Sequence, residues 1–397
     1  MDEVLYQYNP WWEGEAELSD VQPRPRYVEE LVETTRPGRA VFVSGLRRVG
    51  KSTILKLFAA KSIRDGRSPQ SVLYVSLDDY VLRDASIVDV VERFRQLHRH
   101  RRDEPVLVLA DEITAKDDFQ QQIKTLLDRE RVAIVASSSS ASLLRDEKGT
   151  LTGRRSTMEV MPLTLDEYLR FKGVSLRQRD AGLTEEYFRD YARDGGLPEH
   201  VLYPARDYLM SLVEDVIQRD ITAYHGLRDH HVIRDFFTLL MERAGKQVSV
   251  NKLARILGIA PDTARRYLAY FADAYLVHLV PRHGKLNERL TSPSKLYSCD
   301  LGVTHLFVGD RDWGAYFENY VYLLLRQYQS VFYVRDGRTE IDFLTQDGTL
   351  IEAKFHDAMQ GAQLELFERF EAKRKWQLTA IRDLSLIEKT WGSGPTN

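Results

Sequence analysis

The chain has 397 residues, of which 43% are hydrophobic and 29% charged, a balance typical of a soluble globular protein with about two to four domains. Its net charge of −3 excludes nucleic-acid binding driven by overall charge, and its single cysteine, Cys299, excludes an internal disulfide. No run approaches the ~18 apolar residues of a membrane span and the N-terminus lacks a signal pattern, so we expect a cytoplasmic protein without a membrane partner.

A glycine-rich loop follows residues 1–37, which are expected to pack on the first domain. An apolar strand over residues 41–44 runs directly into the pattern G-x-x-x-x-G-K-S, and a helical pattern follows. Glycines let the backbone N–H groups turn inward and the helix adds its positive dipole end, so this order predicts a phosphate-binding loop rather than a plain surface turn. Lys51 would reach the β- and γ-phosphates, and the Ser52 hydroxyl would ligate Mg²⁺. We expect ATP or ADP to contact Gly45, Arg48, Val49, Gly50, Lys51, Ser52 and Thr53.

Further apolar strands alternate with helices after this loop, at residues 71–77, 105–112 and 131–140. Such strands predict an α/β fold with a parallel sheet covered on both faces. Asp111 and Glu112 end the second of them. We expect Asp111 to hold the Mg²⁺ shell and Glu112 to polarise the attacking water, although a capped strand end would show the same pattern. Ser137 or Ser138 would sense the γ-phosphate, or else belong to a plain turn.

Two arginines, Arg154 and Arg155, precede a fifth predicted strand. Either could act as a finger on the γ-phosphate, in its own chain or from a neighbouring subunit of an oligomer. The alternative is a solvated basic pair.

Several segments together carry a family resemblance. They are Asn9-Pro-Trp-Trp12, Gly45-Leu-Arg-Arg-Val-Gly-Lys-Ser52, Leu73-Tyr-Val-Ser-Leu-Asp-Asp79, Asp111-Glu-Ile113, Gly153-Arg154, Pro162-Leu-Thr-Leu-Asp-Glu-Tyr168 and Gly195-Gly-Leu-Pro-Glu199. In this order they resemble the predicted prokaryotic AAA+ ATPases of the AAA_14/DUF4143 type, with similar residues in archaeal and STAND-related ATPases. The resemblance covers essentially the whole chain. It implies that Lys51 and Ser52 bind nucleotide, and that Asp111 with Glu112 serves Mg²⁺ and hydrolysis.

The same resemblance implies a helical lid whose turn, Gly195 to Pro198, touches the nucleotide. Residues 162–243 have a mostly helical pattern, in which Gly-Gly-x-Pro could also be a simple helix break. One departure is visible, because the family's usual Gly-Ser-Ser after the fourth strand is Ala136-Ser137-Ser138 here.

Residues 248–271 show a helix-turn-helix layout, with a short amphipathic helix that stops at Gly258 and a second helix that starts near Pro261. Residues 245–295 contain nine basic and three acidic residues, a local charge of +6 that is typical of phosphate contact. DNA is therefore the expected partner, although winged helices also serve as packing modules. The expected DNA contacts are Lys252, Arg255, Arg265 and Arg266.

A second constellation follows near the C-terminus. A helix carries Glu318, one predicted strand carries Asp342, and its hairpin partner carries Glu352 and Lys354 on one face. These residues resemble the PD-(D/E)xK restriction-endonuclease-like core. In that core Asp342 and Glu352 would hold Mg²⁺, with Glu318 as a further carboxylate, and Lys354 would orient or deprotonate the attacking water. The alternative is a degenerate nuclease fold kept for binding.

These elements predict an AAA+ P-loop ATPase core at 1–165, a helical lid at 166–243, a winged helix at 244–297 and a nuclease-like α/β domain at 298–397. We expect an ATP-hydrolysing protein that acts on DNA and, if its last domain is active, cuts DNA with Mg²⁺. A nucleotide-dependent regulatory switch with a non-catalytic C-terminal domain is the alternative. A remodelling ATPase that acts on protein is a third hypothesis.

Overall fold

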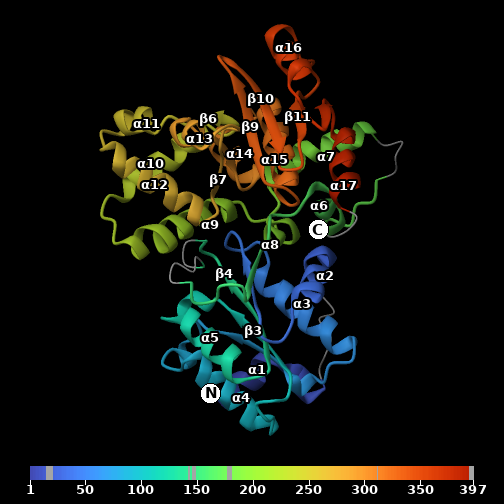
Figure 1. Cartoon of the computed structure of the whole chain (residues 1–397), viewed down its shortest axis with the longest axis vertical. Coiled ribbons are helices and arrows are strands. Elements are labelled where there is room, and N and C mark those ends of the chain that lie inside the picture. The colour runs from blue at the N-terminus through green and yellow to red at the C-terminus, as the bar shows by residue number, and fades with distance from the viewer. Residues whose placement is uncertain (15–20, 142–143, 145–148, 177–180, 311, 393–397) are drawn as a thin grey trace. The chain divides into compact units, whose positions relative to one another are not determined.

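The computed structural model describes residues 1–14, 21–141, 144, 149–176, 181–310 and 312–392, which form two compact units, Met1–Val160 and Met161–Asn397 (Figure 1). The first unit contains the predicted nucleotide loop. The predicted lid, winged helix and C-terminal domain all belong to the second unit. Over the described ranges, no helix combines the length and the apolar character needed to cross a membrane.

A five-stranded parallel sheet forms the centre of the first unit. Its strands are β1 (Ala40–Ser44), β2 (Val72–Ser76), β3 (Val106–Asp111), β4 (Val132–Ser138) and β5 (Arg155–Glu159), in the order β2-β3-β4-β1-β5. Every residue of β1, β3 and β4 is buried, because apolar side chains alternate between two covered faces. The predicted α/β fold with a parallel sheet is confirmed.

Helices cover this sheet on both sides. The chain moves one way along the sheet from β1 to β2 and the other way from β2 to β3 and β4. Right-handed crossovers therefore place α3 (Lys51–Arg64) on one face and α4 (Ile87–His98) with α5 (Phe119–Arg129) on the other (Figure 1). Helix α2 (Pro25–Thr34) packs on α3, and α1 (Asp2–Tyr8) packs near β2. The indole N–H groups of Trp11 and Trp12 both donate to the Val72 carbonyl, so this segment braces the edge strand.

The second unit begins with helices α6 (Leu165–Phe171), α7 (Ala181–Asp194), α8 (Pro198–Leu202) and α9 (Tyr208–Asp215), a π-helical stretch (Val216–Ala223) and α10 (His230–Met241). The predicted Gly-Gly turn joins α7 and α8. A Cβ at Gly195 would lie 2.2 Å from a carboxylate oxygen of Asp300, and one at Gly196 would lie 2.5 Å from the Leu163 carbonyl. Asp300 caps α14 (Leu301–Val308) and accepts a 2.6 Å hydrogen bond from the Gly196 N–H. Close packing within this unit therefore requires both glycines.

Two short helices and a small antiparallel sheet follow. Ser249 caps α11 (Val250–Leu257), Gly258 ends it in the left-handed conformation, and α12 (Pro261–Asp273) begins after a three-residue turn. The sheet has the order β6-β8-β7, with β6 (Lys246–Gln247), β7 (Val277–Val280) and β8 (Lys295–Ser298). Helix α13 (Leu286–Thr291) lies between β7 and β8 in the chain.

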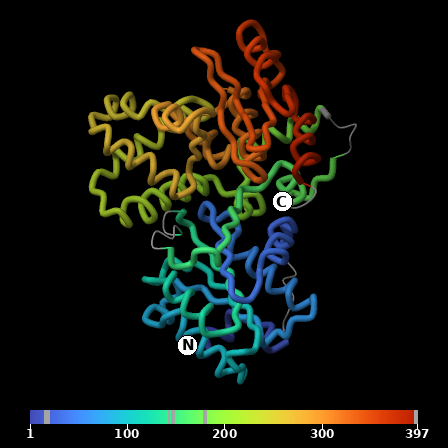
Figure 2. Tube along the Cα trace, in the orientation of Figure 1, coloured from blue at the N-terminus to red at the C-terminus, as the bar shows by residue number. Residues whose placement is uncertain are grey.

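The last part of the chain, drawn in orange to red in Figure 2, forms a mixed four-stranded sheet with the order β12-β11-β10-β9. Its elements follow as α15 (Trp313–Arg326), β9 (Val331–Asp336), β10 (Thr339–Thr345), β11 (Thr349–Ala353), α16 (Gly361–Arg369), β12 (Arg374–Leu378) and α17 (Ser385–Trp391). Strands β9 to β11 are antiparallel, and β12 runs parallel to β11. Aromatic side chains of α15 pack on this sheet and on α7, so this domain and the preceding helices share one core.

Candidate nucleotide site and a carboxylate–lysine cluster

The glycine-rich loop leaves the carboxyl end of β1 and returns to begin α3. Gly45 has φ +143° and Gly50 has φ +94°, so both occupy backbone conformations that favour glycine. Arg48 is also left-handed, with φ +65°. The Ser44 carbonyl accepts a 2.7 Å hydrogen bond from the Val160 N–H, which fixes the loop to the end of β5. The loop therefore has a defined path at the edge of the sheet where parallel α/β folds bind ligands.

Lys51 folds its side chain back over this loop and is only 4% exposed. Its ammonium group donates to the carbonyls of Gly45 and Leu46 and to the Ser139 hydroxyl, each at 3.0 Å. A buried ammonium needs such acceptors, and phosphate oxygens could replace them. The P-loop lysine thus lies over the space that its loop encloses.

Asp111 and Glu112 reach the same edge because β3 pairs with β4 and β4 pairs with β1. The Asp111 carboxylate accepts from the Tyr74 hydroxyl at 2.8 Å and from the Ser137 hydroxyl. Both donors are neutral, so they leave the charge of this carboxylate available to a cation. The Ser137 hydroxyl also accepts from the Glu112 N–H at 3.0 Å, and Glu112 is left-handed with φ +50°.

Ser139 links the two charged groups of the site. Its hydroxyl accepts from Lys51 at 3.0 Å and donates to the Glu112 carboxylate at 3.2 Å. Burial raises the pKa of Glu112, although the nearby Lys51 ammonium opposes the shift. Sequence reasoning missed Ser139 and chose its neighbours, and the only available signal was the run of four serines. Ser138 instead contacts the Thr114 hydroxyl at 3.3 Å and the Ser140 N–H at 3.1 Å.

The two predicted finger arginines lie at the other end of the sheet. Arg155 pairs in register with Ala40, the first residue of β1, whereas the loop follows the last. Arg154 forms an ion pair with Asp128, and Arg155 donates to the Leu144 carbonyl at 2.8 Å. The strand register therefore does not support a finger acting on the nucleotide of its own chain. An action from a neighbouring subunit remains a prediction.

The other predicted nucleotide contacts divide between the two units. Ser52 and Thr53 occupy the first turn of α3, and Val49, within the loop, is fully buried. The Val49 carbonyl accepts a 3.2 Å hydrogen bond from the buried guanidinium of Arg24. Pro198 belongs to the second unit, where it begins α8, and its predicted contact with the nucleotide remains a prediction.

We expect Gly45→Ala to destabilise the first unit. The added Cβ would lie 2.4 Å from the Val160 carbonyl oxygen at a φ that alanine rarely adopts. Clash and backbone strain together predict a loss of about 2 to 4 kcal/mol in the free energy of unfolding, measured by urea titration. Gly38→Ala is the matched control, because its φ is +80° but nothing lies within 4 Å of its Cβ. An equal, small loss for both variants would contradict the contact between Gly45 and β5.

The structure brings together all four predicted nuclease-like residues. Asp342 on β10 accepts from the Ala353 N–H at 3.0 Å, and Glu352 on β11 accepts from the Asp342 N–H at 3.0 Å. Lys354 lies 3.1 Å from a Glu352 carboxylate oxygen.

Sequence reasoning missed two further members of this cluster. Lys295 on β8 contacts Glu318, Glu340 and Asp342. Alternation along β10 could have revealed Glu340, which lies two residues before Asp342 on the same face. Burial, with repulsion from Asp342, raises the pKa of Glu318 to about 7 and that of Glu352 to about 9.

The carboxylates of this cluster are not arranged as the predicted Mg²⁺ site requires. Across the described part of the chain, no group of three or more His, Cys, Asp or Glu side chains is arranged to hold a metal ion. The local charge of +6 includes Lys295, but this side chain is only 3% exposed and therefore does not contribute to a basic surface.

The four predicted DNA contacts, in contrast, are exposed on α11 and α12, and Arg265 forms an ion pair with Asp262.

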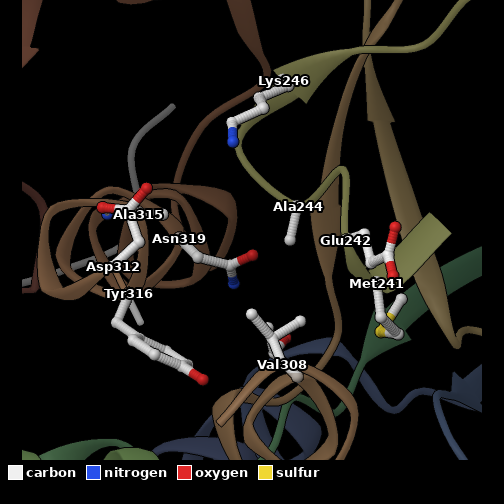
Figure 3. Close-up of a pocket in the computed structure, with 10 residues that line it drawn as sticks. Met241, Glu242, Ala244, Lys246, Val308, Asp312, Ala315, Tyr316 and Asn319 are labelled. Carbon is white, nitrogen blue, oxygen red and sulfur yellow. The ribbon is translucent and has the colours of Figure 1, made fainter. Parts of the chain in front are cut away.

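A separate hollow lies in the second unit between the end of α10, β6, α14 and α15 (Figure 3). Its wall combines apolar and charged side chains: Met241, Glu242, Ala244, Lys246, Thr304, Val308, Asp312, Ala315, Tyr316 and Asn319. The Asn319 amide exchanges hydrogen bonds with the Ser298 backbone at 2.8 and 3.0 Å, so it is committed to the fold.

Comparison with known proteins bears on the segment that contains the glycine-rich loop. Residues 37–169 match the AAA_14 family model, described as an AAA domain, and these residues include the loop, Asp111, Glu112 and the four serines. Over these residues the chain is similar to AAA domains. Residues 185–312 match a domain of unknown function, DUF8612. This match supports the predicted P-loop ATPase family for residues 37–169, here called the AAA domain, and the nuclease assignment remains a prediction.

Similar proteins extend over more of the chain. The uncharacterized protein MJ1544 of Methanocaldococcus jannaschii is 25% identical over 88% of this chain and 80% of its own length. An uncharacterized protein of Haemophilus influenzae is 24% identical over 81% of this chain and 83% of its own length. AMPPCP-bound DnaA from Aquifex aeolicus overlays with a TM-score of 0.29 and 16% identity, covering 65% of this chain and 92% of DnaA. At that score the overlay does not bear on function.

Proposed function

We propose that the AAA domain binds ATP and hydrolyses it to ADP, with Mg²⁺, at the carboxyl edge of its sheet. The arrangement of Lys51, Ser139 and Glu112 carries this proposal. The Ser139 hydroxyl contacts both charged groups beside the glycine-rich loop. The ammonium of Lys51 can bind phosphate oxygens, and the carboxylate of Glu112 can bind a water molecule.

Each side chain has a role in this proposal. Loop N–H groups and the ammonium of Lys51 bind phosphate oxygens, and burial strengthens that attraction. The hydroxyl of Ser52 and the carboxylate of Asp111 would hold Mg²⁺, and the neutral donors around Asp111 fit that role. Bound Mg²⁺ would neutralise phosphate charge. Glu112 orients the attacking water and accepts its proton, and Ser138 or Ser139 senses the γ-phosphate.

Nucleotide uptake tests this proposal directly. We expect a fluorescent ATP or ADP analogue to bind the purified chain, and phosphate release to require Mg²⁺ and to stop when EDTA is added. A folded chain that takes up neither nucleotide would contradict it.

We also propose that α11 and α12 bind the phosphate backbone of DNA, as expected from their helix-turn-helix layout. Lys252, Arg255 and Arg266 are exposed on these helices. Each substitution by alanine is expected to weaken DNA binding for all sequences alike and to lower the salt-dependence slope by about 1. Arg265→Ala should have a smaller effect, because Asp262 already pairs with Arg265.

Fluorescence anisotropy of labelled duplex DNA, titrated at several salt concentrations, measures these effects. The matched control is Lys389→Ala, which removes an exposed lysine from α17 of the same unit. If Lys389→Ala weakened binding as much as Lys252→Ala, the binding would be non-local and the assignment of this surface would be wrong.

A nucleotide-dependent switch with a non-catalytic C-terminal domain is the second candidate function. The helix and strand order from α15 to β12 supports a nuclease-like fold, but the position of Lys295 among the carboxylates favours binding over cleavage. Slow ATP turnover that DNA does not change, without DNA cutting, would favour this candidate.

A further inference from the structure

Lys295 lies at the centre of a carboxylate cluster in the second unit. Its ammonium nitrogen is 2.7 Å from Glu318, 2.8 Å from Glu340 and 2.7 Å from Asp342. The side chain is 3% exposed, so water does not share these contacts to any large extent. One ammonium group therefore satisfies its three donors with three different carboxylates.

These four residues come from three structural elements. Lys295 begins β8 of the small antiparallel sheet, whereas Glu318 comes from α15 and both Glu340 and Asp342 come from one face of β10. The ammonium thus connects the sheet that follows α12 with the C-terminal mixed sheet. Removal of either side would leave buried charge without its partner, which is strongly destabilising.

The carboxylates of the cluster have further hydrogen-bond donors besides Lys295. The Tyr297 hydroxyl donates at 2.7 Å to the same Glu318 oxygen that Lys295 contacts, and the Ala353 N–H donates to the second oxygen of Asp342 at 3.0 Å. Glu352 accepts from the Asp342 N–H at 3.0 Å and from the Gln363 amide at 2.7 Å. Mg²⁺ would need oxygen ligands at about 2.1 Å in octahedral geometry, and an ammonium already occupies the point where these carboxylates converge. The predicted metal therefore does not fit this donor set.

We propose that the ammonium of Lys295 is the resident cation of this site and takes the place of a divalent metal. Two of the carboxylates that would bind metal in a nuclease-like domain, Glu318 and Asp342, instead connect β8 to α15 and β10 through Lys295, whereas Glu352 pairs with Lys354. The native chain accordingly binds no divalent cation at Glu318, Glu340 and Asp342, and removal of Lys295 converts the cluster into a divalent-cation site. This inference is independent of ATP binding by the AAA domain.

Mn²⁺ binding without nucleotide, followed by electron paramagnetic resonance, tests the proposal. We expect the native chain and Asp342→Asn to bind equal amounts of Mn²⁺, because the native cluster holds none. Lys295→Met should gain a bound Mn²⁺, because a positive charge at contact distance is removed. We expect its Kd for Mn²⁺ at this cluster to be lower than that of the native chain by a factor on the order of a hundred. Lys295→Met combined with Asp342→Asn should lose most of this gain. Lys246→Met, an exposed position on β6 of the same small sheet, is the matched control and should gain nothing.

Two results would overturn the proposal. One is a Mn²⁺ ion bound by the native chain that Asp342→Asn abolishes. The other is a folded Lys295→Met variant that gains no Mn²⁺ site dependent on Asp342. If Lys295→Met melts early, Mn²⁺ should raise its melting temperature and leave that of the native chain unchanged. The comparison of the native chain with Asp342→Asn needs no Lys295 variant, so a folding defect does not remove the test.

Discussion

Lys51→Ala is expected to abolish ATP turnover while the fold of the AAA domain persists. The ammonium lies over the loop with three acceptors at 3.0 Å, and phosphate oxygens would take their place. Without it, the charge that develops on the phosphates loses a preorganised cation in a buried site. Loss of one such group costs about 10² to 10³ in rate, before any loss of nucleotide affinity is added.

Phosphate release and binding of a fluorescent ATP analogue, measured side by side, separate these two losses. Lys61→Ala is the matched control, because Lys61 lies on the same helix but forms an exposed ion pair with Asp65 at 2.5 Å. Turnover by Lys51→Ala at the native rate would mean that the nucleotide site lies elsewhere. If Lys51→Ala also unfolds more easily than the native chain, the stability of Lys61→Ala shows whether α3 tolerates the loss of a lysine.

The nucleotide site could be predicted largely because its signals are local. The loop, its strand and its helix are adjacent in the sequence, and Asp111 and Glu112 mark the carboxyl end of β3 directly after its apolar residues. Parallel strands bring such ends to one edge whatever their order in the sheet. The order itself, with β4 between β1 and β3, decides which side chains meet, and no local signal encodes it. For this reason Ser139 was missed although its neighbours were chosen.

Register and tertiary contact explain the other differences. Arg155 was placed near the nucleotide because it precedes a strand, but pairing with Ala40 puts it at the amino end of that strand. Lys295 looked like part of a basic surface, because charge counting along the chain cannot distinguish an exposed lysine from one buried among carboxylates. The Gly195–Gly196 turn resembles a lid motif in the sequence. Within its own unit, close packing against Asp300 and Leu163 explains why both positions are glycines.

Glu112→Gln is expected to keep nucleotide binding and to lose hydrolysis by about 10² to 10⁴, because a general base contributes that much and glutamine cannot accept the proton. The glutamine oxygen can still accept from Ser139, so the loop and Lys51 should stay in place. The variant should therefore trap ATP, which distinguishes it from Lys51→Ala. Quenched-flow hydrolysis and filter binding of labelled ATP measure the two effects, with Glu92→Gln as the control for an exposed carboxylate on α4.

The pH dependence of turnover provides a second measurement of the same role. A base must be deprotonated to act, and burial raises the pKa of Glu112 above the usual value for a glutamate. Turnover by the native chain should thus fall as the pH decreases through this raised pKa, earlier than an exposed glutamate would require. Bound Mg²⁺ and Lys51 oppose the shift, so the profile should be recorded with saturating Mg²⁺ and ATP. If Glu112→Gln kept both the rate and the acid limb of the native profile, another group would have to be the base.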